Sequence, residues 1–106
     1  MQEITATDLK ARMDAGDDIQ LIDVRQPDEH AHANIDGSVL IPMNDVFTRV
    51  DEIDPTRYTV VFCRSGMRSA RVIDALEKSG FAGSLTNLAG GILAWSSEVD
   101  PSVAQY

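Results

Sequence analysis

Cys63, the only cysteine of the chain, begins a short loop whose residues would activate its thiol. From Cys63 the sequence runs Cys-Arg-Ser-Gly-Met-Arg-Ser, so two arginines, Arg64 and Arg68, lie within five residues of the sulfur. A cysteine is nucleophilic only as the thiolate, and its ordinary pKa is about 8.5. These two cations, and the N-terminus of the helix that we expect after the loop, would lower that pKa. Gly66 would let successive backbone amides point inward and bind an anion.

The remaining members of the loop have supporting parts in this hypothesis. Ser65 suits a tight turn with Gly66, and Ser69 can cap the helix and hydrogen-bond the sulfur. Together with Met67 and the two arginines, they form the expected active-site and anion-binding loop. The alternative is a small, inert cysteine at the end of a core strand. The hypothesis therefore requires a thiol that is ionised near neutral pH and accessible to solvent.

Composition and charge limit the classes of protein to which the chain can belong. Its 106 residues, 43% of them hydrophobic, suffice for a single domain over residues 1–106, with a tail from about residue 99. A net charge of −8 disfavours nucleic acid and anionic lipid as partners. A single cysteine excludes an internal disulfide and indicates a reducing compartment. With no signal peptide and no apolar run of the ~20 residues that cross a bilayer, we expect a cytoplasmic monomer.

Short runs of branched aliphatic residues alternate with helical patterns, which predicts an α/β domain around a mainly parallel sheet. Asp23 and Cys63 each lie at the C-terminal end of a predicted strand, so both would lie at the carboxyl edge of that sheet, where ligand sites of α/β folds form. Strands are expected over residues 19–24, 39–41, 58–62 and 84–88. Helices are expected over residues 9–14, capped by Thr7 and Asp8, and over 28–33, 46–53, 70–78 and 90–95.

Four segments in order resemble the rhodanese family of sulfurtransferases. They are Ile22–Glu29, Asn34–Pro42, the Cys63 loop and Asn87–Trp95. The resemblance implies a five-stranded parallel sheet flanked by helices, and a persulfide on Cys63 cradled by the loop amides. It also places Asp23 and Arg25 beside the pocket as supporting residues.

The C-terminal part carries a narrower likeness. The segment Gly90–Trp95, followed by Val99–Ser102 and Tyr106, looks like the rhodanese domains attached to MoeB- and ThiF-type adenylyltransferases. Those fusions supply sulfur for thiocarboxylate formation on small ubiquitin-like carriers, in molybdopterin, thiamine or related synthesis. The resemblance therefore implies a protein sulfur acceptor or a ubiquitin-like carrier as a partner.

The leading hypothesis is a sulfurtransferase of the thiosulfate type. The Cys63 thiolate would attack the sulfane sulfur of a small anionic donor such as thiosulfate, and Arg64 or Arg68 would neutralise the departing sulfite. A thiophilic acceptor, cyanide in the laboratory and a thiol or protein in the cell, would then remove the outer sulfur. The nucleophile is already ionised, so the reaction needs no general base, and no metal or cofactor is expected.

Two other functions remain open at this point. One is a non-catalytic rhodanese module that docks a partner and only receives sulfur. The other is a cysteine phosphatase or arsenate reductase, because phosphatases of the Cdc25 type share the fold. Their loop has five residues between cysteine and arginine, whereas four separate Cys63 from Arg68. A shorter ring of amides fits one sulfur atom better than a tetrahedral phosphate, so the spacing favours sulfur transfer.

Other polar residues have structural explanations as well as functional ones. The Asp23 and Arg25 pair could brace the pocket, or it could mark a strand-end salt bridge, such as one between Arg25 and Glu29. His30 and His32 are expected to face solvent, because two residues apart on a helix they do not share a face. Gly90-Gly91 could bring backbone close to the site, although a plain helix start would explain it.

Overall fold

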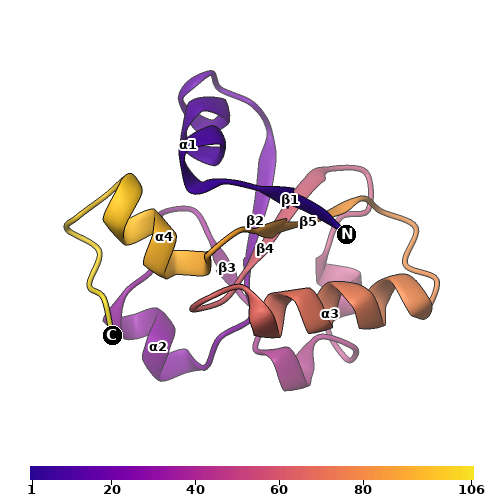
Figure 1. Ribbon diagram of the computed structural model, residues 1–106. Helices are drawn as coiled ribbons and strands as arrows, with labels where there is room; N and C mark the ends of the chain where they lie inside the picture. The colour runs from indigo at the N-terminus through magenta and orange to yellow at the C-terminus, as the bar shows by residue number, and fades with distance from the viewer.

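Five short strands form one sheet in the computed structural model, which describes residues 1–106 (Figure 1). Their order across the sheet is β1-β5-β4-β2-β3, and every neighbouring pair is parallel. The predicted α/β fold with a parallel sheet is therefore confirmed. The strands are β1 (Gln2–Ile4), β2 (Ile19–Asp23), β3 (Val39–Leu40), β4 (Tyr58–Phe62) and β5 (Leu85–Leu88).

Four α-helices and two 3₁₀ helices cover the two faces of this sheet. The helices are α1 (Ala6–Asp14), α2 (Pro27–His32), α3 (Met67–Lys78), α4 (Gly91–Glu98), η1 (Met43–Asp45) and η2 (Val50–Glu52). One buried cluster joins the sheet to α1 and α4, and a second joins it to α3 and the segment that holds η1 and η2. Figure 1 accordingly shows α3 across the sheet from α1. None of the helices is long and apolar enough to cross a membrane.

Successive side chains of β4 point to opposite faces of the sheet and therefore enter different buried clusters. Val60 and Phe62 pack with α1 and α4, whereas Val61 and Cys63 pack with α3. The strand is buried on both faces, which explains its nearly continuous apolar sequence. Cys63 therefore leaves the strand on the side where α3 begins.

The structure corrects the predicted helix over residues 46–53. This segment instead consists of turns and the 3₁₀ helix η2, and it follows directly on η1; its hydrogen bonds join residues three apart, such as Ile53 N to Val50 O. Val46 and Ile53 are buried in the α3 cluster, so their spacing reflects burial and not a continuous α-helix. The strand expected over 39–41 is β3, which lies at the edge of the sheet and leaves Val39 49% exposed.

Three helix starts also differ from the prediction. The Thr5 side chain caps α1 by accepting a hydrogen bond from the Asp8 amide, so α1 begins before Thr7. Pro27, whose ring suits the first turn of a helix, begins α2. α3 begins at Met67 and not at Ala70, because its N-cap Gly66 adopts a φ of 106° and the loop turns directly into the helix. The residue pattern also gave no sign of β1, a strand of only three residues.

A fully buried ion pair holds α2 to the end of β2. Arg25 and Asp23 are both 0% exposed and share two hydrogen bonds, of 2.9 and 2.7 Å. Arg25 also donates to the main-chain oxygens of Ala33 and Glu29, on the C-terminal side and within α2. The strand-end salt bridge that was the alternative for Arg25 is present, but its partner is the Asp23 carboxylate and not that of Glu29.

Replacing Arg25→Leu should lower the free energy of unfolding by about 3–5 kcal/mol, because it leaves the Asp23 carboxylate buried without its cation. Urea unfolding followed by circular dichroism measures this loss. Arg57→Leu is the matched control, since it removes an exposed pair with Asp18 and should cost about 1 kcal/mol or less. Equal losses in the two variants would contradict the importance of the buried pair.

Candidate active site

The sheet brings Cys63 to its carboxyl edge, beside the end of β2. Asp23 is in register with Phe62, the residue before Cys63, so the two strands end together. The predicted meeting of Asp23 and Cys63 at one edge is confirmed. The two side chains nevertheless belong to different environments, because Cys63 packs among the apolar residues under α3 whereas Asp23 binds Arg25.

The loop after Cys63 curls so that its donors face the sulfur. The Gly66 amide donates to Sγ at 3.1 Å, and the Ser69 hydroxyl lies 3.4 Å from the same atom. Burial raises the pKa of the Cys63 thiol, but hydrogen bonds from the Ser69 hydroxyl and from the amides of Ser69, Gly66 and Ser65 outweigh it. The net pKa lies below its ordinary value. A thiolate can therefore persist in a site that is largely shielded from water.

The side chain of Asn87, on β5, holds this loop in place through hydrogen bonds. Its amide nitrogen donates to the Gly66 carbonyl at 3.0 Å, and its Oδ1 accepts from the Ser69 hydroxyl at 2.6 Å. The Ser69 hydroxyl has one hydrogen, so Asn87 and the sulfur compete for it. The backbone amides, in contrast, point at the sulfur whichever partner the Ser69 hydroxyl binds.

Sequence analysis did not single out Asn87 as a site residue. The available signal was an asparagine inside an otherwise buried strand, since a buried amide must find partners. Its partners, Gly66 and Ser69, lie about twenty positions away in the chain, and only the fold identifies them.

The start of α4 packs directly against the backbone of the loop. The amides of Ile92 and Leu93 donate to the carbonyls of Cys63 and Arg64 at 2.9 and 3.1 Å. Gly91 has a φ of 61°, and a Cβ atom at this position would lie 2.4 Å from the Arg64 carbonyl oxygen. Gly90-Gly91 does begin α4, as a helix start would require, and Gly91 in addition permits close backbone contact with the site.

The two loop arginines bind other parts of the protein and not the sulfur. Arg68 donates two hydrogen bonds to the Glu29 carboxylate, at 2.7 and 2.9 Å. Arg64 donates to the main-chain oxygen of Tyr106. The largest causes that lower the Cys63 pKa are hydrogen bonds within the loop. The charge of Arg68 also interacts with that of Cys63, so this cation favours the thiolate without touching it. Both guanidinium groups nevertheless belong to the loop, and that of Arg68 is paired with the Glu29 carboxylate.

Glu29 and Tyr106 link the loop to the buried ion pair. Hydrogen bonds from Arg68 lower the pKa of Glu29 to about 2, against the opposing effect of burial. The Tyr106 hydroxyl donates to Glu29 at 2.7 Å and accepts from Arg25 at 2.7 Å. Asp23 and Arg25 thus do not touch the sulfur, and reach the loop only through Glu29, Tyr106 and Arg68.

The histidines differ from one another. His30 does not simply face solvent as expected, because its Nδ1 lies 2.9 Å from the Asp23 carboxylate and its side chain is only 28% exposed. His32 is exposed and lies edge-on to the Tyr106 ring. No three histidine, cysteine, aspartate or glutamate side chains gather as a metal-binding group.

Cys63 is much less accessible than the hypothesis requires, since the residue is 1% exposed. The residues around it on the loop are open to solvent: Arg64 and Ser65 are exposed, and Met67 is 67% exposed. The expected solvent-accessible thiol is therefore wrong for this conformation. Any reaction at the sulfur therefore needs a local displacement of the loop, against the hydrogen bonds that hold it.

Comparison with known proteins gives consistent matches over nearly the whole chain. Residues 5–98 match the family described as the rhodanese-like domain. A sulfurtransferase of Allochromatium vinosum is 36% identical over 104 residues, which cover 98% of this chain and 96% of that protein. MoeZ of Mycobacterium tuberculosis, named as an adenylyltransferase/sulfurtransferase, is 35% identical over 105 residues, which cover 97% of this chain but only 26% of MoeZ. A rhodanese-like domain protein of Staphylococcus aureus superposes with a TM-score of 0.84 at 30% identity, covering 93% of this chain and 95% of that one.

Replacing Gly91→Ala should destabilise the protein by roughly 1–3 kcal/mol through backbone strain, and by more through the clash with Arg64, which should also displace the loop. Gly37→Ala is the matched control, because Gly37 also has a positive φ, of 85°, but nothing lies within 4 Å of its added Cβ. Urea unfolding of both variants measures the difference. If the two variants lose equal stability, the close packing of α4 on the loop does not matter.

The rate of Cys63 alkylation by iodoacetamide should rise with pH through a midpoint below the ~8.5 of an ordinary cysteine, because only the thiolate reacts. Ser69→Ala removes a donor to the thiolate and should move this midpoint upward. Ser65→Ala is the control, since the Ser65 side chain makes no hydrogen bond to the sulfur and its amide is retained. A thiol that stays inert over the whole pH range would contradict both its activation and its access to solvent.

Proposed function

Because the chain belongs to the rhodanese-like domain family of sulfurtransferases, we propose that Cys63 carries sulfane sulfur as a persulfide, taken from a small anionic donor such as thiosulfate. The observation that carries this proposal is the group of loop donors around Sγ, with the Gly66 amide at 3.1 Å. The same ring of amides suits a thiolate and the terminal sulfur of a persulfide, because each is a single sulfur anion.

The first half-reaction loads the cysteine. The Cys63 thiolate attacks the outer, sulfane sulfur of thiosulfate and forms a sulfur–sulfur bond. The bond between the two sulfur atoms of thiosulfate breaks, and its electron pair leaves with sulfite. One thiolate and one thiosulfate dianion thus become one persulfide anion and one sulfite dianion, with no proton transferred and no external oxidant or reductant.

The second half-reaction returns the cysteine to its resting state. An acceptor thiolate attacks the outer sulfur of the persulfide, and the Cys63 thiolate leaves with the electron pair. With cyanide as the acceptor the product is thiocyanate. The loop amides stabilise the leaving thiolate as they stabilise the attacking one, so one arrangement of donors serves both steps.

The arginines assist by charge and not by contact with the resting thiolate. Arg68 is held by Glu29 and Arg64 by Tyr106, so their guanidinium groups are pre-positioned at the mouth of the loop. A doubly charged donor competes for these groups as it approaches, and the positive charge offsets the repulsion between the donor and the thiolate. Release of Arg64 from Tyr106 would also loosen the exposed side of the loop and give the donor access to the sulfur.

The acceptor in the cell is proposed to be a thiol or a protein, including a ubiquitin-like sulfur carrier. The likeness to MoeZ supports this class of acceptor, since MoeZ is named for both adenylyl and sulfur transfer. A free, unpaired cysteine also fits a reducing compartment such as the cytoplasm.

Incubation of the protein with thiosulfate should increase its intact mass by one sulfur atom, and a reductant should remove that mass. Cys63→Ser should show no increase while it retains the folded circular-dichroism spectrum, because the nucleophile is replaced by a hydroxyl of similar size. The steady-state assay is formation of thiocyanate from thiosulfate and cyanide.

Each alternative function gives a different result in the same experiments. A docking module that only receives sulfur from a partner would gain no mass from thiosulfate and form no thiocyanate. A phosphatase would hydrolyse an aryl phosphate without gaining sulfur. Either outcome, or sulfur uptake by Cys63→Ser, would overturn the proposed persulfide.

A further inference from the structure

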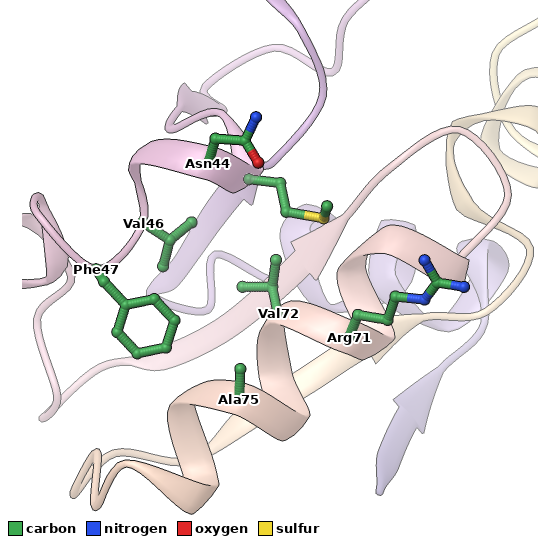
Figure 2. A pocket seen from close by; sticks show the side chains of 7 residues that line it. Asn44, Val46, Phe47, Arg71, Val72 and Ala75 are labelled. Carbon is green, nitrogen blue, oxygen red and sulfur yellow. The ribbon is translucent and has the colours of Figure 1, made fainter.

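A groove of about 260 Å³ lies between α3 and the segment that follows β3 (Figure 2). Val46 and Phe47 form one wall, and Val72 and Ala75 of α3 form the other. Figure 2 shows these four side chains facing one another across the groove. Phe47 is 56% exposed, so its ring adds apolar surface that a bound molecule could cover.

The groove begins beside the catalytic loop. Its lining residue Met43 donates a backbone hydrogen bond to Val24, and Val24 donates one to Phe62, the residue before Cys63. Val72, from the opposite wall, belongs to the same buried cluster as Cys63. A lining residue, Arg71, also comes two positions after Ser69 on α3, so a molecule bound in the groove would contact α3 within one turn of the loop.

Arg71 sets this groove apart from the rest of the surface. The chain has nine lysines and arginines, and eight of them contact a carboxylate or, for Arg64, a main-chain oxygen. Arg71 is the exception: it is exposed, lines the groove and has no such partner. Figure 2 shows it at the end away from Phe47, with the exposed amide of Asn44 also at the rim. In a chain of net charge −8, this unpaired cation gives the apolar groove a charge complementary to a carboxylate.

We propose that this groove binds the protein acceptor of sulfur, through a segment in which a large apolar side chain is followed by one acidic residue. The inference rests on the proposed sulfur transfer and names the class of its acceptor. The volume suits one or two side chains and is below the usual range for a cofactor, ~300–1,000 Å³. The apolar side chain lies between Phe47 and Ala75, and the carboxylate binds Arg71.

The overall charge limits how acidic this segment can be. Repulsion from the net charge of −8 is screened beyond about 8 Å at physiological ionic strength, so the nearby Arg71 dominates for a single carboxylate. A second copy of the chain is disfavoured, because it would bring the same net negative charge to the contact. Binding here would hold an acceptor cysteine close to the persulfide and raise its effective concentration.

The test uses acetylated, amidated peptides of sequence Cys-(Gly)n-Leu-Asp, with one to four glycines. The protein is first loaded with thiosulfate and freed of excess donor, and transfer to each peptide is then timed by mass spectrometry. Matched peptides carry Ala in place of Leu, or Asn in place of Asp. At the best linker length, we expect the Leu peptide to react about tenfold faster than the Ala peptide. We expect the Asp peptide to react about threefold faster than the Asn peptide.

Two variants assign these preferences to the groove. Arg71→Gln should remove the preference for Asp and keep that for Leu, whereas Phe47→Ser should weaken the preference for Leu and keep that for Asp. Arg57→Gln, which alters a cation with an Asp18 partner, is the control and should keep both. All three variants should load sulfur from thiosulfate at the wild-type rate, because none touches the sulfur. Equal rates with all peptides, or preferences that survive both groove variants, would overturn the proposal.

A binding measurement separates this inference from the proposed function. A thiol-free peptide, with Ser in place of Cys, is titrated into ¹⁵N-labelled protein. Saturable amide shifts should concentrate at Asn44, Val46, Val72 and Ala75 and disappear in Phe47→Ser. If the protein fails to load sulfur but shows these shifts, the sulfur chemistry is wrong and the groove stands. If it loads sulfur without these shifts, or shows shifts that depend on protein concentration without peptide, the groove has no such acceptor.

Discussion

The hydrogen bond from the Gly66 amide to Cys63 Sγ is the contact on which the rest of the site depends. Cys63 is the continuation of a strand buried on both faces, so the fold places its sulfur where water is scarce. Burial alone would keep the thiol protonated. Hydrogen-bond donors can make a thiolate stable there, and the loop supplies them as the Ser69 hydroxyl and as backbone amides, which no side-chain motion withdraws. Because burial disfavours the thiolate, the donors that stabilise it have to stay in place, and the surrounding structure holds the loop accordingly.

Three elements hold the loop in the conformation that points its amides inward. Asn87 binds the Gly66 carbonyl from β5, and the first turn of α4 binds the carbonyls of Cys63 and Arg64. On the outer side Arg68 is tied to Glu29, which joins the buried Asp23 and Arg25 pair through Tyr106. The loop carbonyls thus point outward to these partners, and its amides are left to face the sulfur. Rigidity of this kind preorganises the site for a sulfur anion, and it also encloses the sulfur, so reaction requires a local opening.

Reaction at the sulfur and recognition of the acceptor are assigned to different parts of the protein, the Cys63 loop and the groove beside α3. The loop amides treat any sulfur anion alike, because they contact a single atom and nothing of the molecule attached to it. Discrimination between acceptors therefore has to come from outside the loop. The groove between α3 and the segment after β3 is placed for this purpose, since its walls share a buried cluster with Cys63 and its Arg71 has no partner of its own. α3 thus begins at the sulfur and continues as one wall of the proposed acceptor site.

The sequence by itself determined the α/β class, the strand that ends at Cys63 and the donor-rich loop that follows, because these depend on residues adjacent in the chain. Local patterns predicted secondary structure less well in two cases. Val46 and Ile53 are buried at a spacing that resembles that of an α-helix although they do not lie in one, and β1 has too few residues to form a recognisable pattern. The partners of Arg64 and Arg68 were decided only by the tertiary structure. Their proximity to Cys63 in the sequence suggested that both bind the sulfur, but Arg64 binds Tyr106 and Arg68 binds Glu29. The roles of Asn87 and Gly91 and the burial of the sulfur were also decided only by the tertiary structure. Each depends on where β5 and α4 lie relative to the end of β4, and hydrogen bonding and packing between distant segments determine that position.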